Sequence, residues 1–306
     1  MPEMNYRYDG SFAGLLCCVF ESYVKKEIPA RILPPEEEQI SLLPAREIGT
    51  DSERAARVLA SVPKKMGPEA LGFIRRAFLT CLPDRATLIF RFFRVGYREG
   101  PRVMRLLTDN TIGPLFRAVR NLENESHLLK GFLRFSDFDG TLIAEMEPKN
   151  TVLPLLARHF CARYPGERFL IFDRTHKMAL IHQPGRTAVL PLESLTLPRP
   201  GEAERMYRAL WKKYYAAAEV PGRHNEKCRM SNMPKRYWGC MTEFAPDSEA
   251  NKKIASPPES SLPGREANGQ QEPVNFLTYS RSSSSEQISE ALPQTESCTF
   301  CGRPEK

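Results

Sequence analysis

The stretch GFLRFSDFDGTLIAEM, residues 131–146, decides the fold. Apolar and polar side chains alternate over residues 131–136 and again over 141–146, as in strands with one buried face. Between the two runs lies Asp139-Gly140, a dipeptide typical of a two-residue hairpin turn. We therefore expect a β-hairpin here, and we expect the chain to change character at Gly131.

Downstream of this hairpin, further apolar runs predict more strands. They cover residues 168–173, 177–182 and 187–190, and a short helix is expected before them at 153–164. The runs are short and closely spaced, which favours strands that pair with their neighbours in sequence. We expect an antiparallel sheet of four or five strands over residues 131–195.

The segments on either side of this sheet have a helical period. Apolar residues recur at three and four positions from Phe12 to about Lys130, and again at Met206, Tyr207, Leu210, Trp211 and Tyr214. Helix starts are expected at Asp51 and Asp84, and breaks between helices at Pro63, Pro68, Pro83 and Pro101. The predicted fold class is α+β, a largely helical body around a small antiparallel sheet. Residues 1–245 would form one domain, helical over 1–130 and over 196–245.

The last 61 residues differ in composition from the rest. Pro and Ser make up 18 of them, and few positions could build a core, so residues 246–306 are predicted to be a disordered tail. The tail ends in Cys298-Thr-Phe-Cys301, whose spacing suits half of a zinc or iron–sulfur site. These thiols are weak candidate metal ligands, and the alternative is a solvated tail with free thiols. No metal site is predicted elsewhere.

Composition favours a soluble chain. The 306 residues are 41% hydrophobic with a mean hydropathy of −0.43, and no apolar run approaches the length of a membrane span. The start has no basic stretch followed by an apolar one, so no secretory signal is expected and the cytoplasm is the expected location. Eight cysteines in so long a chain do not form a disulfide scaffold in that compartment.

The net charge of +7 is unevenly distributed. Residues 246–306 hold six Lys/Arg against nine Asp/Glu, a net charge of −3, so the preceding 245 residues carry +10. A folded part this basic favours a polyanionic partner, most often nucleic acid.

One basic candidate is a row of arginines at helical spacing. Its members are Arg91, Arg94, Arg98, Arg102 and Arg105. On an unbroken helix their guanidinium groups would follow a phosphate backbone, although Gly96, Gly100 and Pro101 interrupt the row. The alternative is a solvated basic face.

A second basic candidate is the segment RHNEKCRMSNMPKRYW, residues 223–238. Asn232 and Pro234 suit the start of a helix, which would place Lys235 and Arg236 in its first turn. Cations there are best explained by a bound anion such as phosphate, and Tyr237 and Trp238 offer surfaces on which a base could stack. The alternative is a core tryptophan with solvated charges.

The motif most suggestive of catalysis is Asp137-Phe-Asp139-Gly-Thr-Leu, which has the form of the haloacid dehalogenase phosphatases. There the two carboxylates serve as nucleophile and acid/base beside a magnesium ion. Here the motif coincides with the predicted hairpin turn rather than with the end of a buried parallel strand, so we favour a turn. Weaker acid/base candidates are His159 with Arg163, His127 beside Glu125, and Asp173 at a strand end.

Several of these segments together resemble a bacterial family assigned to DNA repair or DNA metabolism. The similar segments, between about Tyr6 and Phe244, are Tyr8-Asp-Gly-Ser-Phe, Glu125-x-His127-x-x-x-Gly131-Phe-x-Arg134-Phe, Asn150-x-Val-Leu-Pro-Leu-Leu-Ala-Arg-His159-Phe, Phe172-Asp173, Leu210-Trp211-Lys212 and Met233-Pro-Lys-Arg-Tyr-Trp238. Two positions depart from the family pattern: Asp137 and Asp139 replace other turn residues, and His176 stands where relatives carry an arginine.

The resemblance implies a DNA-linked role. Members are typically encoded beside a radical SAM protein, and in some the domain is fused to a uracil-DNA glycosylase-like domain. We therefore expect a cytoplasmic DNA-binding protein that acts with a radical SAM partner, and we predict no cofactor. An enzyme of this kind would be a hydrolase making a glycosylase-like attack on a damaged base. The alternative is a non-catalytic adaptor that presents DNA to the radical SAM enzyme.

The site expected from the resemblance combines the basic and acid/base candidates. Arg223, Lys235 and Arg236 would hold phosphate, while Tyr237 and Trp238 would stack on a base or line a pocket. Asn225, His159, Arg163 and Asp173 would line the same cleft, with Asp173 and His159 as the catalytic candidates.

Overall fold

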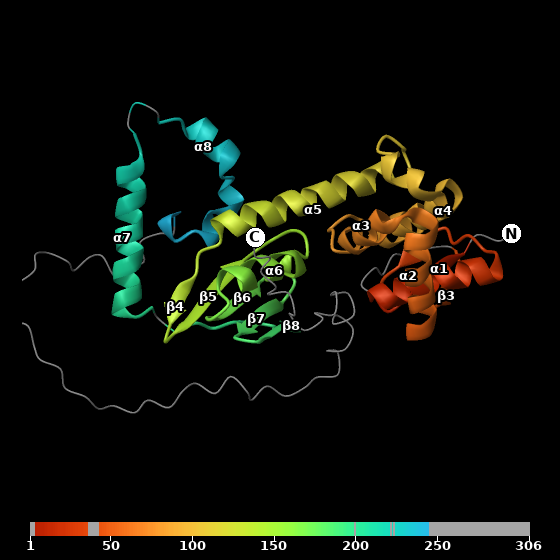
Figure 1. The fold of residues 1–306 in the computed structure, drawn as a ribbon, viewed down its shortest axis with the longest axis horizontal. Helices are drawn as coiled ribbons and strands as arrows, with labels where there is room; N and C mark the ends of the chain where they lie inside the picture. Colours follow the sequence, from red (N-terminus) through yellow and green to blue (C-terminus); the bar gives the residue numbers. More distant parts are fainter. Residues whose placement is uncertain (1–3, 36–42, 199, 221, 223, 245–306) are drawn as a thin grey trace, which may run out of the picture.

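The computed structural model describes residues 4–35, 43–198, 200–220, 222 and 224–244 (Figure 1). The predicted tail, with Cys298 and Cys301, lies outside these residues. Helices dominate the described part and two small sheets accompany them, so the α+β fold class is confirmed. No described helix is both long enough and apolar enough to span a bilayer.

The first part of the described chain is mainly helical, as expected. Its elements are β1 (Asn5–Arg7), α1 (Phe12–Lys25), β2 (Ile32–Leu33), β3 (Ala45–Glu47), α2 (Ser52–Met66), α3 (Pro68–Phe78), α4 (Arg85–Glu99) and the 3-10 helix η1 (Gly100–Arg105). Apolar faces of these helices meet in one hydrophobic core, which includes Leu15, Val62, Ile74 and Phe93.

A small parallel sheet in this part was not predicted. Its strand order is β2-β1-β3, with β1 parallel to both neighbours. Strands of two or three residues are too short to show a period of two, so the sequence carries no signal for them.

Two of the predicted helix starts are confirmed. The Asp51 carboxylate accepts hydrogen bonds from the backbone N–H groups of Glu53 and Arg54 at the start of α2. Asp84 directly precedes α4, although its side chain pairs with Arg31 instead of capping the helix. The break predicted at Pro63 is wrong, because Pro63 lies within α2 on an exposed position, where the loss of one N–H donor does not end the helix.

The predicted hairpin turn and its second strand are confirmed, but the first strand expected at 131–136 is wrong, because residues up to Phe132 are helical and the strand covers only Ser136–Phe138. Strands β4 (Ser136–Phe138) and β5 (Thr141–Met146) pair antiparallel, with Phe138 opposite Thr141, so Asp139-Gly140 forms the two-residue turn. Both turn residues have positive φ, 51° and 79°. This is the geometry of a type I′ turn, which Asp-Gly adopts readily.

Replacing Gly140 by alanine is expected to destabilise the protein by about 1 kcal/mol, because its positive φ strains any residue with a Cβ. Urea unfolding of the Gly140→Ala variant measures this. Gly166→Ala is the matched control, since a Cβ at Gly166 meets nothing within 4 Å and its backbone is not left-handed. Equal losses in the two variants would contradict the expectation.

The main sheet has five strands in the order β4-β5-β6-β7-β8. The strands β6 (Arg168–Asp173), β7 (Met178–Gln183) and β8 (Arg186–Pro191) follow one another as antiparallel neighbours. The expectation of a purely antiparallel sheet needs one correction, because β5 and β6 are parallel. Helix α6 (Leu153–Arg163) connects them, and a helical crossover returns the chain to the same end of the sheet.

The two faces of this sheet are covered differently. One face, with Ala144, Ile171 and Leu180, packs against α6 and against α5 (Gly113–Phe132), the long helix that leads from the helical part to the sheet (Figure 1). The other face, with Leu170 and Phe172, is covered by a short stretch that follows β8 and includes Leu192, Leu195 and Leu197.

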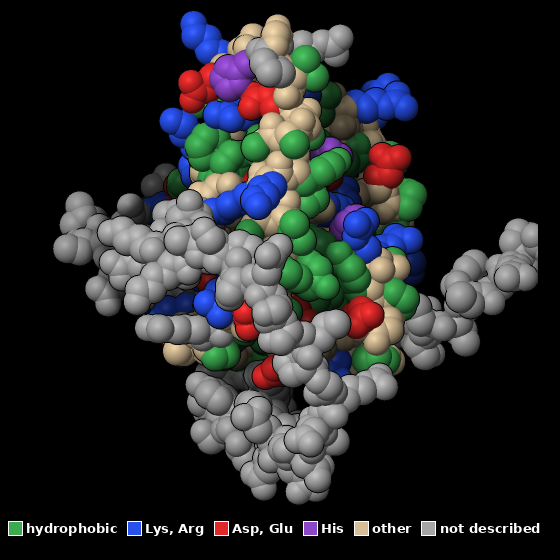
Figure 2. Space-filling view, turned by 90° about the vertical axis from the view of Figure 1, so that its left-hand side faces the viewer, with side chains coloured by type: hydrophobic (Ala, Val, Ile, Leu, Met, Phe, Trp, Pro, Cys, Tyr) green, Lys and Arg blue, Asp and Glu red, His purple; other side chains and the backbone are tan. Residues whose placement is uncertain are grey.

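The last described helices are α7 (Glu202–Ala218), α8 (Glu226–Asn232), and the 3-10 helices η3 (Lys235–Cys240) and η4 (Thr242–Phe244). The helical period predicted α7 correctly, but none of its residues is buried. Its apolar side chains Met206, Tyr207, Leu210, Trp211 and Tyr214 are all exposed. The face of the molecule on the α7 side shows hydrophobic side chains beside lysines and arginines (Figure 2).

Candidate nucleic-acid interface

The segment predicted to hold phosphate forms η3, which packs against α5 and β5. One detail of the prediction is wrong: Asn232 does not cap this helix but ends α8, and Pro234 directly precedes η3. Lys235 and Arg236 are the first two residues of η3, and both are exposed. Arg223 lies outside the described residues.

Arg236 has a structural as well as an electrostatic role. Its guanidinium carbon lies 4.5 Å from the centre of the Tyr237 ring, and its Nη2 lies 3.8 Å from Oε1 of the buried Glu125. Tyr237 is only 3% exposed and contacts Phe132 of α5, so its ring offers almost no surface to a base. Burial raises the pKa of the Tyr237 hydroxyl.

Trp238 is half-buried and already stacked. Its ring lies 4.4 Å from that of Phe244 with an interplanar angle of 14°, and its indole N–H donates to the Met233 carbonyl at 3.0 Å. The Lys235 ammonium and the Arg229 guanidinium each lie 5.7 Å from the ring centre. These contacts fix the indole and hold two cations beside it.

Asn225 is the N-cap of α8. Its side-chain oxygen accepts a hydrogen bond of 2.9 Å from the backbone N–H of Cys228. This capping hydrogen bond is sufficient to explain why an asparagine occurs at this position, and no bound ligand is needed to explain it.

A second basic group lies where α6 meets α5. Burial lowers the pKa of His159, and the positive charges of Lys130 and Arg163 lower it further. Within the described part of the chain, neither Lys130 nor Arg163 forms an ion pair with a carboxylate. Lys130 and Arg163 therefore leave positive charge unneutralised beside His159.

We expect His159 to titrate below its ordinary pKa of 6.5. The unfolded chain then binds more protons than the folded one just below that pH, so the free energy of unfolding should fall as the pH falls through this window. Histidine-resolved NMR titration measures the pKa, and His159→Gln should remove this part of the pH dependence. In Lys130→Ala the pKa should rise, since a like charge is lost. Titration at or above 6.5 in the unmodified protein would contradict the expectation.

Asp173 ends β6 and is 0% exposed. One carboxylate oxygen accepts from the backbone N–H groups of Thr175 and His176, at 3.1 and 3.0 Å. The other lies 2.7 Å from Nδ1 of His176. The carboxylate thus orders the turn between β6 and β7, and neither oxygen reaches the surface.

The two catalytic candidates lie apart along α6. This helix runs back from the end of β5 to the start of β6, so Asp173 lies near its first turn. His159 is six residues beyond Leu153, about 9 Å further along the axis. The fold therefore does not bring Asp173 and His159 together.

The basic candidates lie on two flanks of α5. Lys130 acts on His159 of α6, whereas Phe132 contacts Tyr237 of η3 with ring centres 5.6 Å apart. Residues two apart on a helix point to nearly opposite sides. The fold therefore places η3 and the His159 group on either side of one helix.

Sequence reasoning overlooked the structural importance of Glu125. It is 2% exposed, and its carboxylate accepts hydrogen bonds from the backbone N–H of Lys149 at 3.1 Å and from the backbone and side-chain N–H groups of Asn150 at 2.9 and 2.6 Å. The Asn150 side-chain oxygen in turn accepts from the N–H of Cys81 at 2.9 Å. The sequence did carry a signal that Glu125 is buried: it lies three residues after Leu122 and four before Leu129, on the same face of the helix as these apolar residues.

Comparison with known families places much of the chain in a family. The sequence profile of DUF4130, described as a domain of unknown function, matches residues 83–243. The chain belongs to the DUF4130 family. The matched region is more than half of the chain and contains α4, α5, the five-stranded sheet and η3. No curated protein and no solved structure matches the chain.

The arginine row lies at the start of the DUF4130 region, on α4 and η1. The helix ends at Gly100, which has a φ of 64°, so the row is interrupted as the sequence suggested. All five arginines are exposed, and among the described residues only Arg98 has a carboxylate partner, Glu99 at 2.8 Å. The row is therefore a basic surface at the end of the molecule opposite η3 (Figure 1).

The phosphatase-like motif of this DUF4130 chain is a turn. The Asp137 carboxylate accepts a hydrogen bond of 2.9 Å from the backbone N–H of Gly140, and Asp139 is an exposed turn residue. In the part of the chain that the structure describes, no group of three or more His, Cys, Asp or Glu is placed to hold a metal ion.

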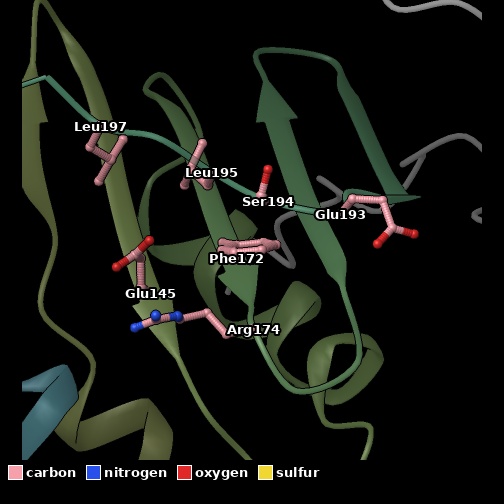
Figure 3. Close-up of a pocket in the computed structure, with 7 residues that line it drawn as sticks. All are labelled: Glu145, Phe172, Arg174, Glu193, Ser194, Leu195 and Leu197. Carbon is pink, nitrogen blue, oxygen red and sulfur yellow. The ribbon is translucent and has the colours of Figure 1, made fainter.

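A shallow pocket of about 380 Å³ lies on the sheet face opposite α6. Phe172 lies beneath it, Glu145 and Arg174 stand at one end and Ser194 at another (Figure 3). None of the described site residues predicted for this DUF4130 chain lines it. The pocket and the basic groups are therefore separate features.

Proposed function

We propose that this DUF4130 protein binds DNA through basic side chains on the two flanks of α5 and acts in DNA repair or DNA metabolism in the cytoplasm. The observation that supports this best is the group of His159, Lys130 and Arg163. Lys130 and Arg163 carry positive charge beside His159 and have no described carboxylate partner, and a phosphate would provide the missing counter-charge.

On the other flank, Lys235 and Trp238 add to the proposed surface. Lys235 is exposed and forms no ion pair with a described carboxylate, which leaves its ammonium, beside the indole, able to bind phosphate. Trp238 is held by Phe244 and Met233, so it would serve as a rigid wall for a base near the backbone contact.

Salt-dependent binding of a fluorescent DNA duplex to the full chain tests this proposal. The Arg163→Ala/Lys235→Ala double variant should lose roughly tenfold in affinity, and the slope of log K against log salt should fall by about 1.8. Arg236 is left intact, because its contacts with Tyr237 and Glu125 would confuse binding with folding. Affinity equal to that of the unmodified protein would reject this surface.

A catalytic version of the proposal is a glycosylase-like hydrolase. Asp173 is fully buried and both its oxygens are hydrogen-bonded, so a water-activating role would require the turn to open. Incubating the protein with duplexes that carry uracil or other damaged bases, and measuring abasic product, tests for this glycosylase-like activity. Abasic product that depends on Asp173 would support it, and none across the panel would reject it.

A second candidate function, the non-catalytic adaptor, is favoured by α7. The exposed apolar side chains at Met206, Leu210 and Tyr214 recur at spacings of four and form one stripe. Stripes of this kind mark protein interaction surfaces. We propose that the radical SAM partner binds here.

Co-purification of the full chain with the radical SAM protein tests the adaptor. Leu210→Asp should abolish the complex, whereas Ala216→Asp, on an exposed position of the same helix away from the stripe, should leave it intact. A complex that survives Leu210→Asp would show that the partner does not bind at this stripe.

A further inference from the structure

The solvent-facing side of α5 carries two arginines, Arg117 and Arg120, that no sequence motif included. Five residues recur at spacings of three and four and are all exposed: Arg117, Arg120, Asn124, His127 and Gly131. That spacing places them on one face of the helix, which we call the outer face. The inner side carries the buried residues Leu115, Val119, Leu122, Ser126 and Leu129.

This outer face carries no acidic side chain. Of the two glutamates of α5, Glu125 is buried, and Glu123 borders this face, three residues after Arg120 and four before His127, where it is paired with Arg76 at 2.9 Å. Arg117 and Arg120 have no ion-pair partner among the described residues. The fixed positive charges of the outer face are therefore Arg117 and Arg120, near the start of the helix.

The outer face continues into the basic group on α6. Lys130 follows His127 by three residues on α5 and acts electrostatically on His159, beside Arg163. From Arg117 to Lys130 the helix rises about 20 Å. In Figure 1, α5 is one long helix that spans the molecule between the helical part and the sheet, so its outer face is elongated.

The side chains on the outer face indicate which form of DNA it suits. Binding of single strands relies on aromatic side chains that stack on bases, and the outer face has none. Arginine and asparagine side chains in a straight row suit a phosphate backbone instead, and 20 Å of duplex carries about 12 phosphates.

We propose that the outer face of α5 is a track for the phosphate backbone of duplex DNA, contacted without regard to base sequence. The inference rests on the proposed DNA binding. It adds that the DNA is a duplex, that the duplex lies along α5, and that Arg117 and Arg120 contact it. Duplex would lie along α5, and the flanking groups on α6 and η3 would meet it toward one end.

The test measures binding of the full chain to a duplex and to a single strand of equal length over a range of salt concentrations. Arg117→Ala/Arg120→Ala should weaken duplex binding roughly tenfold and lower its salt slope by about 1.8, with a clearly smaller effect on the single strand. Both arginines lack described partners, so the variant should unfold at the same temperature as the parent protein. The Arg186→Ala/Arg205→Ala variant removes the same charge from exposed positions on β8 and α7 and should change neither parameter.

The outcomes separate this inference from the proposal beneath it. Duplex binding that is normal in Arg117→Ala/Arg120→Ala but reduced in Arg163→Ala/Lys235→Ala would overturn the track and keep the proposed function. An equal loss in the control double variant would show a net-charge effect and overturn the track. An equal or larger loss for the single strand would overturn the duplex assignment. If the unmodified chain binds no DNA, both are wrong.

Discussion

Replacing Glu125 by alanine should lower the free energy of unfolding by about 4 kcal/mol. The carboxylate accepts hydrogen bonds from the backbone N–H groups of Lys149 and Asn150 in a site that is only 2% exposed. Removing it leaves buried donors with no acceptor, and water cannot easily replace it. The loss should also free the Asn150 side chain, which holds the N–H of Cys81.

The effect should be large because Glu125 joins three distant segments. It lies on α5, Asn150 precedes α6, and Cys81 lies between α3 and α4. The hydrogen bonds therefore connect the helical part to the sheet, beside the surface formed by η3. Urea unfolding followed by circular dichroism measures the change.

Glu123→Ala is the matched control for Glu125→Ala. Glu123 is two residues away on the same helix, and its ion pair with Arg76 is exposed, with side chains 49% and 42% accessible. Such surface pairs contribute at most about 1 kcal/mol, so this variant should unfold close to the parent protein. Similar losses in the two variants would show that the buried network contributes little.

The second large effect is expected for Asp173. Asp173→Ala should destabilise the protein by about 3 kcal/mol, because two backbone N–H groups of the β6–β7 turn lose their acceptor in a fully buried position. Asp173→Asn keeps an oxygen in the same place and should cost only about 1 kcal/mol. The difference between the two unfolding free energies measures the hydrogen bonds to the turn.

The asparagine variant also separates structure from catalysis. Because Asp173→Asn should fold, any base-excision activity of the parent protein that disappears in it would assign chemistry to the carboxylate. Activity that persists in Asp173→Asn would contradict a catalytic role of the carboxylate. Unfolding as severe as in Asp173→Ala would contradict the expectation that asparagine keeps the hydrogen bonds of the turn. Asp137→Ala, which removes a single exposed turn hydrogen bond, controls for the loss of a turn carboxylate.

Much of the local structure could be predicted from the sequence. The Asp139-Gly140 turn and the Asp51 cap are set by interactions within a few residues, so their residue types suffice. The amphipathic period likewise located α7 and most of the helices before the sheet. The short strands β1, β2 and β3 could not be predicted, because their pairing depends on residues distant in sequence.

The candidate site was predicted less well, for a related reason. Lys235, Arg163 and His159 could be selected by residue type, but which of them share a surface depends on how α6 and η3 pack against α5, and this packing joins segments distant in sequence. The stacking surface of Tyr237 is buried against Phe132, and the Asp173 carboxylate is used within its own turn. Tyr237 and Phe132 are more than 100 residues apart in the sequence, whereas Asp173 and His176 are only three residues apart. In both cases the packing of the folded chain decides how the side chain is used.

By itself, then, the sequence determined the α+β class, the hairpin turn at Asp139-Gly140, and a basic chain that carries +10 before residue 246. These depend on local turn chemistry, on periodicity and on counting charges. Only the tertiary structure decided where that charge is left without a counter-charge. Ion pairs such as Arg76 with Glu123 neutralise some arginines, while Arg117, Arg120, Lys130 and Arg163 find no described carboxylate within reach. Pairing requires contact between side chains, and contact is set by the fold.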